Sequence, residues 1–291
     1  MKIGLLTRNK NAWCSTRLRE AMVNAGAEPF CFSFDELVTR VSFEPKISVG
    51  GTDIAAELSA IIVRPIGRGS LEECLYRLDA LHRAERNGLP IFNPPSAIEK
   101  ALDKYYALTL LEENGVPVPR TVVTESPDEA LGAFDMLGGD VVVKPMFGSR
   151  GVGITRVNDR EIAERIFREL QYFRHILYIQ EFVEHGNQDI RALVVGDRVV
   201  AAMYRSAEGW KTNVSRGASP IPLRLPDELG NLAVEAARTI GCRIAGVDIL
   251  ETQSGPLVCE INSQPGWKGL QRTTELDIAS EIVDFVIQSV T

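Results

Sequence analysis

Long apolar runs are missing from this chain of 291 residues. No segment approaches the ~18 consecutive apolar residues that a membrane span requires. The first ten residues, MKIGLLTRNK, turn polar too soon to form a signal peptide. Apolar residues still make up 45% of the chain, which is enough for a sizeable core. We therefore expect a cytoplasmic globular protein that has no membrane partner.

Positive charge is also scarce, because the formal net charge is −7 at pH 7. Nucleic-acid binding needs clustered Lys and Arg, so no nucleic-acid partner is expected. The five cysteines form no CxxC pair, and the three histidines share no ligand spacing with them or with each other. This pattern predicts reduced thiols and no zinc site. A GxSxG motif and a plausible Cys–His pair are missing too, which argues against a side-chain nucleophile.

A P-loop of the form GxxxxGK[ST] is absent, although a related pattern occurs in the reverse order. Residues 141–153 read VVVKPMFGSRGVG. The stretch VGITRV, residues 152–157, overlaps the end of this segment and is predicted to be a strand. The lysine is Lys144, and the small and polar residues after it include Gly148, Ser149, Gly151 and Gly153. Such glycines let backbone N–H groups approach phosphate oxygens, so the loop is predicted to be a flap between two strands. Taken alone, Lys144 could equally reach out to solvent.

Periodicity divides the chain into three segments, for which we expect a combination of α/β and α+β architecture. The segments are 1–95, 96–183 and 184–291. The first alternates short buried strands with helical patterns, which predicts an open, mainly parallel α/β unit. The second opens with one predicted helix that starts at Ser96, has Glu99 at capping-box spacing and stops at Gly115. The third carries two hairpins and two helices, which predicts an α+β unit.

The hairpin AGVDILETQSGPLVCEIN carries carboxylates in an apolar setting. Glu260 and Asn262 are two apart on one strand and therefore share a face. A turn centred near residue 254 places Asp248 opposite Glu260. Two close carboxylates in an apolar sheet are costly unless a cation compensates them, and magnesium prefers such hard oxygen ligands. A solvated face and a glycosidase-type acid pair are the alternatives.

Several other polar positions are candidates whose individual signals are weak. Lys104 lies on the predicted helix, where a solvated face is the alternative. Asp189 and Arg191 share a strand face, and Arg205 lies near Asp189 on the return strand, so a structural ion pair is the alternative. The strand LYIQEF could present backbone groups to a base, and the loop WKTNVSRGA is basic in an acidic protein.

The order of these signals resembles the ATP-grasp superfamily, and within it the RimK-like branch of glutamate ligases. The stretches that carry the resemblance are VVKP…GSRGVG, DIRALVVGDRVVAAMYR, TNVSRGA and EINSQPGW. The resemblance covers nearly the whole chain. It implies three subdomains, with ATP bound between a middle lid and a C-terminal unit. It also implies an amide ligase that works through an acyl phosphate.

The resemblance assigns roles to individual residues. Lys104 and Lys144 would contact the phosphates of ATP under the flap, and the Glu181–Phe182 backbone would hold adenine. Other nucleotide contacts would come from Asp189, Lys211, Thr212 and Asn213. Magnesium, or manganese in its place, would be held by Asp248, Glu260 and Asn262. Arg205 and Arg216 would face the acyl phosphate or the incoming amino acid.

The acceptor is the part of the reaction that the resemblance defines least. The segment NSQPGWKGLQ resembles members that add glutamate to small cofactors such as tetrahydromethanopterin, whereas others modify a protein C-terminus or an amino-group carrier protein. Trp267 could offer a stacking face and Lys268 a cation, or Trp267 could simply pack the loop. Arg64 and Arg68 are further candidate acceptor contacts. The expected partners are therefore L-glutamate and an acceptor carboxylate, with a homo-oligomer as an option. A protein that binds ATP without ligation is the remaining alternative.

Overall fold

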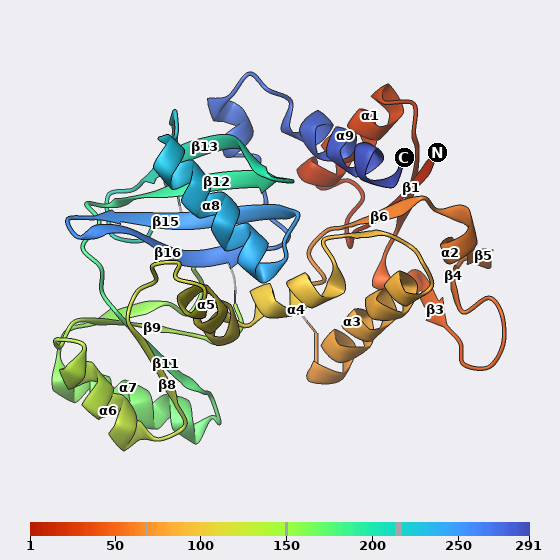
Figure 1. Cartoon of the computed structure of the whole chain (residues 1–291). Coiled ribbons are helices and arrows are strands. Elements are labelled where there is room, and N and C mark those ends of the chain that lie inside the picture. The colour runs from red at the N-terminus through yellow and green to blue at the C-terminus, as the bar shows by residue number, and fades with distance from the viewer. Residues whose placement is uncertain (68, 149–150, 213–216) are drawn as a thin grey trace.

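The computed structural model describes residues 1–67, 69–148, 151–212 and 217–291. Within these ranges the strands form four sheets (Figure 1). Three larger sheets follow one another along the chain, and a small three-stranded sheet is attached to the first. No helix in the described ranges combines the length and the apolar character needed to cross a bilayer.

The N-terminal unit is built on a parallel sheet with the order β2-β1-β6-β7, as its alternating pattern predicted. Its strands are β1 (Lys2–Leu6), β2 (Glu28–Phe32), β6 (Ala60–Val63) and β7 (Ile91–Phe92). Its helices are α1 (Trp13–Asn24), α2 (Ile54–Glu57) and α3 (Leu71–Arg86). The small antiparallel sheet consists of β3 (Leu37–Thr39), β4 (Ile47–Val49) and β5 (Thr52–Asp53). This sheet was not predicted.

The single helix predicted from Ser96 to Gly115 is wrong. Two helices occur instead, α4 (Pro95–Leu102) and α5 (Lys104–Glu113). The chain breaks at Asp103 because its carboxylate accepts hydrogen bonds from the N–H groups of Tyr105 and Tyr106 and so acts as the N-cap of α5. Proline begins α4, and no side chain caps that helix. Both helices contact α8 and β16 of the C-terminal unit.

The lid is an antiparallel sheet with the order β10-β9-β11-β8, covered on one face by two helices. Its elements are β8 (Thr121–Thr124), α6 (Pro127–Met136), β9 (Val141–Lys144), β10 (Thr155–Val157), α7 (Arg160–Tyr172) and β11 (Leu177–Glu181). Val141 and Val143 pack with Ile179 in the core beneath α6 and α7. Because side chains alternate along a strand, Lys144 and Gln180 lie on the opposite face.

The C-terminal unit is a five-stranded antiparallel sheet with the order β14-β13-β12-β15-β16. Its elements are β12 (Gln188–Val195), β13 (Arg198–Ser206), β14 (Ser219–Pro222), α8 (Asp227–Ile240), β15 (Ile244–Thr252) and β16 (Gly255–Asn262). The turn between β12 and β13 falls at Gly196-Asp197, as predicted. Ile190, Val247 and Ile261 point toward α8 and share its apolar core.

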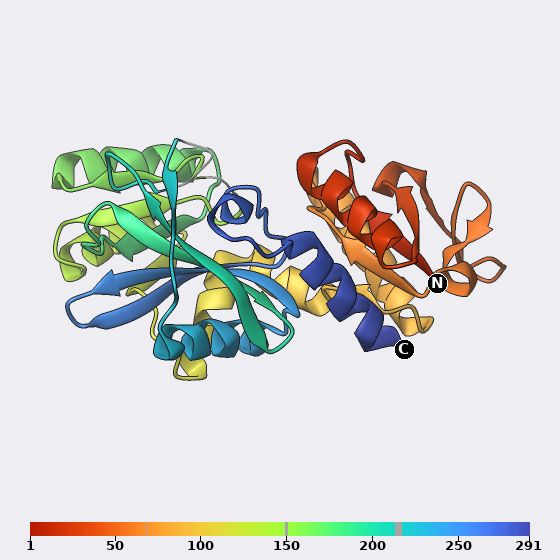
Figure 2. The same ribbon diagram turned by 90° about the horizontal axis from the view of Figure 1, so that it is seen from above.

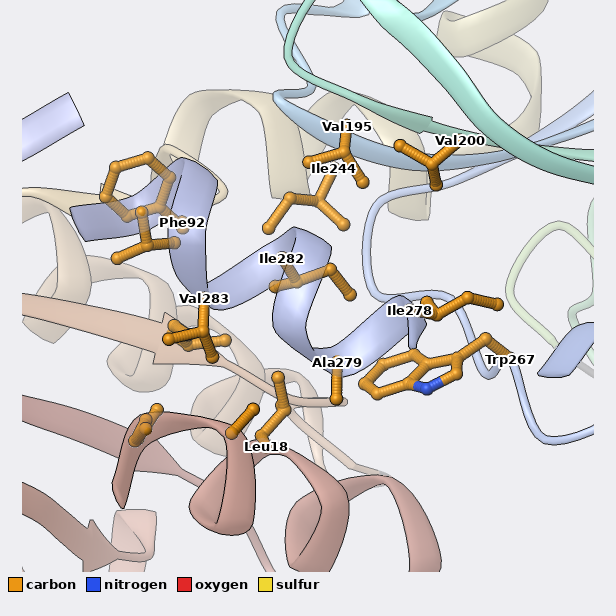
Figure 3. Packing of buried hydrophobic residues seen from close by; sticks show 14 of the residues in the cluster. Leu18, Phe92, Val195, Val200, Ile244, Trp267, Ile278, Ala279, Ile282 and Val283 are labelled. Carbon is orange, nitrogen blue, oxygen red and sulfur yellow. The ribbon is translucent and has the colours of Figure 1, made fainter. Parts of the chain in front are cut away.

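Helix α9 (Ile278–Val290) joins the first unit to the last (Figures 1 and 2). One side of α9 packs on α1, and the same apolar cluster includes residues of β12, β13 and β15. Figure 3 shows Ile282 between Leu18 of the N-terminal unit and Ile244 of the C-terminal sheet. Asn93 makes a second link, because its buried amide bonds backbone atoms of Arg243, Ile244 and Ser263.

Candidate active site

Six polar side chains gather on the face of the C-terminal sheet that turns away from α8. Strand alternation places them there, because their immediate neighbours point into the core under α8. They are Asp189, Arg191, Arg205, Asp248, Glu260 and Asn262. Sequence reasoning had proposed all of them except Arg191 for the site. This polar face is the floor of the candidate site.

Asp248 lies opposite Glu260 across β15 and β16, which confirms the predicted pairing. The turn itself is centred half a residue earlier than predicted, since Thr252 pairs with Gly255. A regular ladder from that turn would place Cys259 opposite Asp248. The register shifts between Asp248 and Ile249, so one residue of β16 bulges and Glu260 takes the position instead.

Asp248 belongs to a buried network of alternating charges. Arg205 donates Nε to Asp189 at 2.7 Å and also bonds the second oxygen of that carboxylate. The same guanidinium lies 3.0 Å from Asp248, and Arg191 bonds both Asp248 oxygens from the other side. Asp189, Arg205 and Asp248 are each no more than 5% exposed. Two arginines thus compensate Asp248, a role that sequence reasoning gave to a metal ion alone.

The ionisation of this network follows from its geometry. Burial alone would raise the pKa of Asp248, but Arg191 and Arg205 outweigh it and hold the pKa below the ordinary value. Burial would likewise lower the pKa of Arg205, but Asp248 and Asp189 overcome that effect and raise the pKa. Both side chains therefore stay charged at neutral pH. The network forms a rigid, ionised base for whatever binds above it.

The donor set fits a hard divalent cation. Among the described residues no group of three or more His, Cys, Asp or Glu side chains could hold a metal ion, and the predicted set has two carboxylates and an amide. The Glu260 side chain is 33% exposed and forms an ion pair with Lys104 at 3.8 Å. Asn262 donates its amide nitrogen to the Gly246 carbonyl at 3.4 Å, so Oδ1 is the atom that would coordinate a cation. Asp248 Oδ1 accepts one hydrogen bond, from Arg191, so one acceptor site remains.

Lys104 connects this floor to the lid. Its Nζ lies 3.8 Å from Glu260 Oε1 and donates to the Gly148 carbonyl at 2.8 Å. Burial and the nearby Lys144 lower the pKa of Lys104, and Glu260 partly offsets this. The break at Asp103 places Lys104 in the first turn of α5, so its side chain projects from a fixed helix end. The structure thus brings together Lys104, Lys144, Gly148 and Glu260.

Lys144 is held by Gln180, a residue that sequence reasoning missed. The lysine donates to Gln180 Oε1 at 2.6 Å, and Gln180 Nε2 donates to Thr121 Oγ1 at 2.9 Å. Gln180 is only 3% exposed. A buried glutamine inside the strand LYIQEF was the available signal, because such a group needs hydrogen-bond partners.

The glycine loop is tied down at both ends. Gly148 accepts from Lys104, and Ile154 accepts from Lys211 at 2.7 Å. Gly151 and Gly153 have φ angles of 68° and 79°, a backbone region that residues with a side chain rarely adopt. The predicted contacts Ser149, Asn213 and Arg216 lie outside the described residues, as does Arg68.

The predicted adenine segment is already partly engaged. The Glu181 N–H donates to the Arg120 carbonyl, and the Phe182 N–H donates to the Asp140 carbonyl. Both N–H groups are therefore used within the lid. Of the backbone groups of Glu181 and Phe182, only the two carbonyls are left to bond a base. The Phe182 ring lies 5.9 Å from those of His185 and Trp210, and Thr212 nearby in sequence is buried.

Of the two alternatives for Trp267, a stacking face or simple packing, the structure supports packing. The indole is 1% exposed and packs edge-on against Trp13 at a centroid distance of 6.4 Å. Apolar residues of α1 and α9 belong to the same buried cluster, so the ring is part of the core. Arg64 is also buried, with Cζ 4.8 Å from the Trp267 ring centroid. Lys268 remains exposed.

Solved structures with the same arrangement define the class of fold. The ATP-grasp ligase PsnB complexed with a phosphomimetic variant of minimal precursor, Mg and ADP matches with a TM-score of 0.77 at 22% identity, over 100% of this chain and 98% of PsnB. The D-cycloserine synthetase DcsG matches with a TM-score of 0.75 at 19% identity, over 100% of both chains. The RimK domain protein ATP-grasp from Sphaerobacter thermophilus matches with a TM-score of 0.74 at 21% identity, over 99% and 100%. The fold is the ATP-grasp fold.

Sequence relatives define the family. Residues 101–286 match the RimK-like ATP-grasp domain. The tetrahydromethanopterin:alpha-L-glutamate ligase of Methanococcus maripaludis is 35% identical, covering 98% of this chain and 97% of the relative. A "Probable alpha-L-glutamate ligase" of Aliivibrio fischeri is also 35% identical, covering 98% and 95%. The chain belongs to the RimK-like ATP-grasp family and is an ATP-dependent carboxylate–amine ligase, of a class that uses a divalent metal.

Replacing Lys144 with Ala is expected to weaken nucleotide binding roughly ten- to hundredfold, because a hydrogen bond to a charged group contributes about 1.5–3 kcal/mol. Calorimetric titration of ADP with magnesium measures the effect. Lys10→Ala, which removes an exposed lysine, serves as the matched control. Unchanged affinity in Lys144→Ala would remove the lysine from the phosphate site.

Proposed function

We propose that this ligase joins the amino group of L-glutamate to a carboxyl group of a small pterin-type cofactor. The supporting observation is the similarity to three tetrahydromethanopterin:alpha-L-glutamate ligases, from Methanococcus maripaludis, Methanosarcina acetivorans and Methanocaldococcus jannaschii. Identities run from 34% to 39%, and the first two alignments cover 98% of this chain.

The reaction proceeds in two balanced steps. An acceptor carboxylate oxygen attacks the terminal phosphorus of ATP, which gives an acyl phosphate and ADP. The glutamate nitrogen then attacks the acyl carbon, the C–O bond to phosphate breaks, and the amine loses a proton. Amide, ADP and phosphate are the products. This chemistry depends on positioning and charge neutralisation more than on a side-chain nucleophile.

The residues divide these tasks between the floor and the lid. Lys144 neutralises phosphate charge from the lid, and Lys104 does so from the start of α5, between the lid and the floor. Magnesium, or manganese, would be held by Asp248, Glu260 and Asn262, and would add positive charge beside the transferred phosphoryl group. The flap excludes water, which would otherwise hydrolyse the acyl phosphate.

Arg205, Asp189 and Lys211 support the site indirectly in this proposal. The resemblance places Arg205 facing the acyl phosphate or the amino acid, but this residue is 4% exposed and already pairs with Asp189 and Asp248, so in this proposal it acts on the site through those two carboxylates. Asp189 in turn orients Arg205 beneath the nucleotide. Lys211 keeps the loop after β13 against the far end of the flap.

An assay of ADP release with tetrahydromethanopterin and L-glutamate tests the acceptor. ADP release should require both compounds, and mass spectrometry should find one or more glutamyl groups on the pterin. A peptide acceptor is the second candidate, since the ATP-grasp ligase PsnB was solved with the precursor peptide PsnA2. Glutamylation of a ribosomal-protein C-terminus or an amino-group carrier protein, with none on the pterin, would replace the first candidate by the second.

A further inference from the structure

A buried arginine without an acidic partner lies where the N-terminal unit meets the C-terminal unit. Arg64 follows β6 directly and is 8% exposed. Its guanidinium contacts the face of the Trp267 ring, and no hydrogen bond or ion pair joins that group to any residue the structure describes. Burial lowers the pKa of Arg64, which reflects the missing counter-charge. An arginine in this position calls for an anion.

Two more donors around the same cavity also lack acceptors. The Trp267 indole N–H and the Gln264 Nε2 group are both buried and unbonded. Gln264 Oε1 accepts from the Ile66 N–H at 3.3 Å, which fixes the orientation of the amide. Asn93 cannot serve as their acceptor, because its oxygen already accepts from the N–H groups of Arg243 and Ile244.

These groups line one small cavity of about 10 Å³, together with Asn93 and Ser263. A cavity of this size holds about one water-sized group. Water is a poor match. Its oxygen can accept only two hydrogen bonds, whereas three donors line the cavity, and its own two hydrogens would also need acceptors. One oxygen of an anion fills this space and accepts from several donors, whereas a complete carboxylate or a pterin ring is too large to enter.

We propose that Arg64, Gln264 and Trp267 form a subsite for a carboxylate that is not consumed in the reaction. One carboxylate oxygen would enter the cavity that the two loop residues line, and Arg64 would supply the opposite charge. The ligand is L-glutamate, whose carboxylates both survive ligation, and this choice of ligand rests on the proposed function. A carboxylate on the arm of the acceptor is the other source of the same chemistry.

The subsite would position its ligand next to the reacting groups. Gln264 lies two residues after Asn262, so the loop that carries two of the donors continues directly from the strand of the proposed metal ligands. The third donor comes from the N-terminal unit. A bound carboxylate would therefore fasten the two units together next to the floor of the candidate site.

The Arg64→Met variant tests the subsite in the full-length enzyme. The Michaelis constant for L-glutamate should rise at least about tenfold, while that for ATP stays the same, because an arginine–carboxylate pair is lost. Trp267→Phe removes the indole N–H together with part of a buried ring, so its free energy of unfolding is measured alongside, and it should raise the same constant by a smaller factor. Arg243→Met replaces an exposed arginine and should change neither constant.

Thermal unfolding without ATP separates this inference from the proposed function. L-glutamate should raise the melting temperature of the wild type and leave Arg64→Met unchanged, because only a folded state with the subsite binds it. If tetrahydromethanopterin raises the melting temperature of the wild type and L-glutamate does not, the subsite belongs to the acceptor. If neither compound shifts the wild type and the Arg64 and Trp267 variants keep normal Michaelis constants, the subsite does not exist. Glutamate binding without any ligation would refute the function and keep the subsite.

Discussion

Replacing Glu260 with Gln should lower kcat about a hundred- to a thousandfold, the loss typical when one preorganised charged contact to a transition state is removed. Glu260 is the most exposed carboxylate of the floor and the one nearest to Lys104. The substitution keeps the shape of the side chain and removes the negative charge that would hold the cation. The rate of ADP release at saturating ATP measures the loss.

Stability distinguishes this outcome from misfolding. Because Glu260 lies at the rim of the buried ion network, Glu260→Gln should change the free energy of unfolding by less than about 1 kcal/mol. Glu235→Gln, on the exposed side of α8, is the matched control and should leave kcat unchanged. A Glu260→Gln enzyme with near-normal turnover would eliminate the proposed metal set.

Replacing Asp248 with Asn should lower the free energy of unfolding by about 3–5 kcal/mol, because it leaves buried arginines without a counter-charge. Arg191 loses its carboxylate partner entirely, and Arg205 keeps only Asp189. Urea unfolding in the presence of a chelator measures the effect with no metal or nucleotide bound. The loss therefore reports on the network and not on a ligand.

An exposed pair of the same chemistry provides the comparison. Asp197 lies 3.4 Å from Arg238, and both side chains are more than two-thirds exposed. Asp197→Asn should cost no more than about 1 kcal/mol. If Asp248→Asn lowers the free energy of unfolding as little as Asp197→Asn does, the arginines find other partners and the buried network adds no special stability.

Strand alternation made much of the floor predictable from the sequence. A period of two places Glu260 and Asn262 on one face, and a hairpin brings Asp248 close to them. The pairing of Asp248 with Glu260 was correct, although it depends on a bulge that no turn signal announced. The parallel N-terminal sheet followed from its alternation of strands and helices.

The contacts that were missed join segments far apart in the chain. Arg191 pairs with Asp248 because β12 and β15 are neighbours in one particular register, and no local pattern encodes that register. Trp267 is buried because helices from both ends of the described chain surround it. The break at Asp103 was local, but the apolar period across it favoured one continuous helix.

The position of α9 has a consequence for how the chain folds. Arg17 of α1 and Asp277, just before α9, lie 3.1 Å apart although 260 positions separate them. During synthesis, α1 leaves the ribosome long before its partner helix exists. Contacts between such distant segments form late, since the intervening chain must first be ordered. The apolar side of α1 must therefore wait for α9, and the lid has the chance to fold while that side is still uncovered.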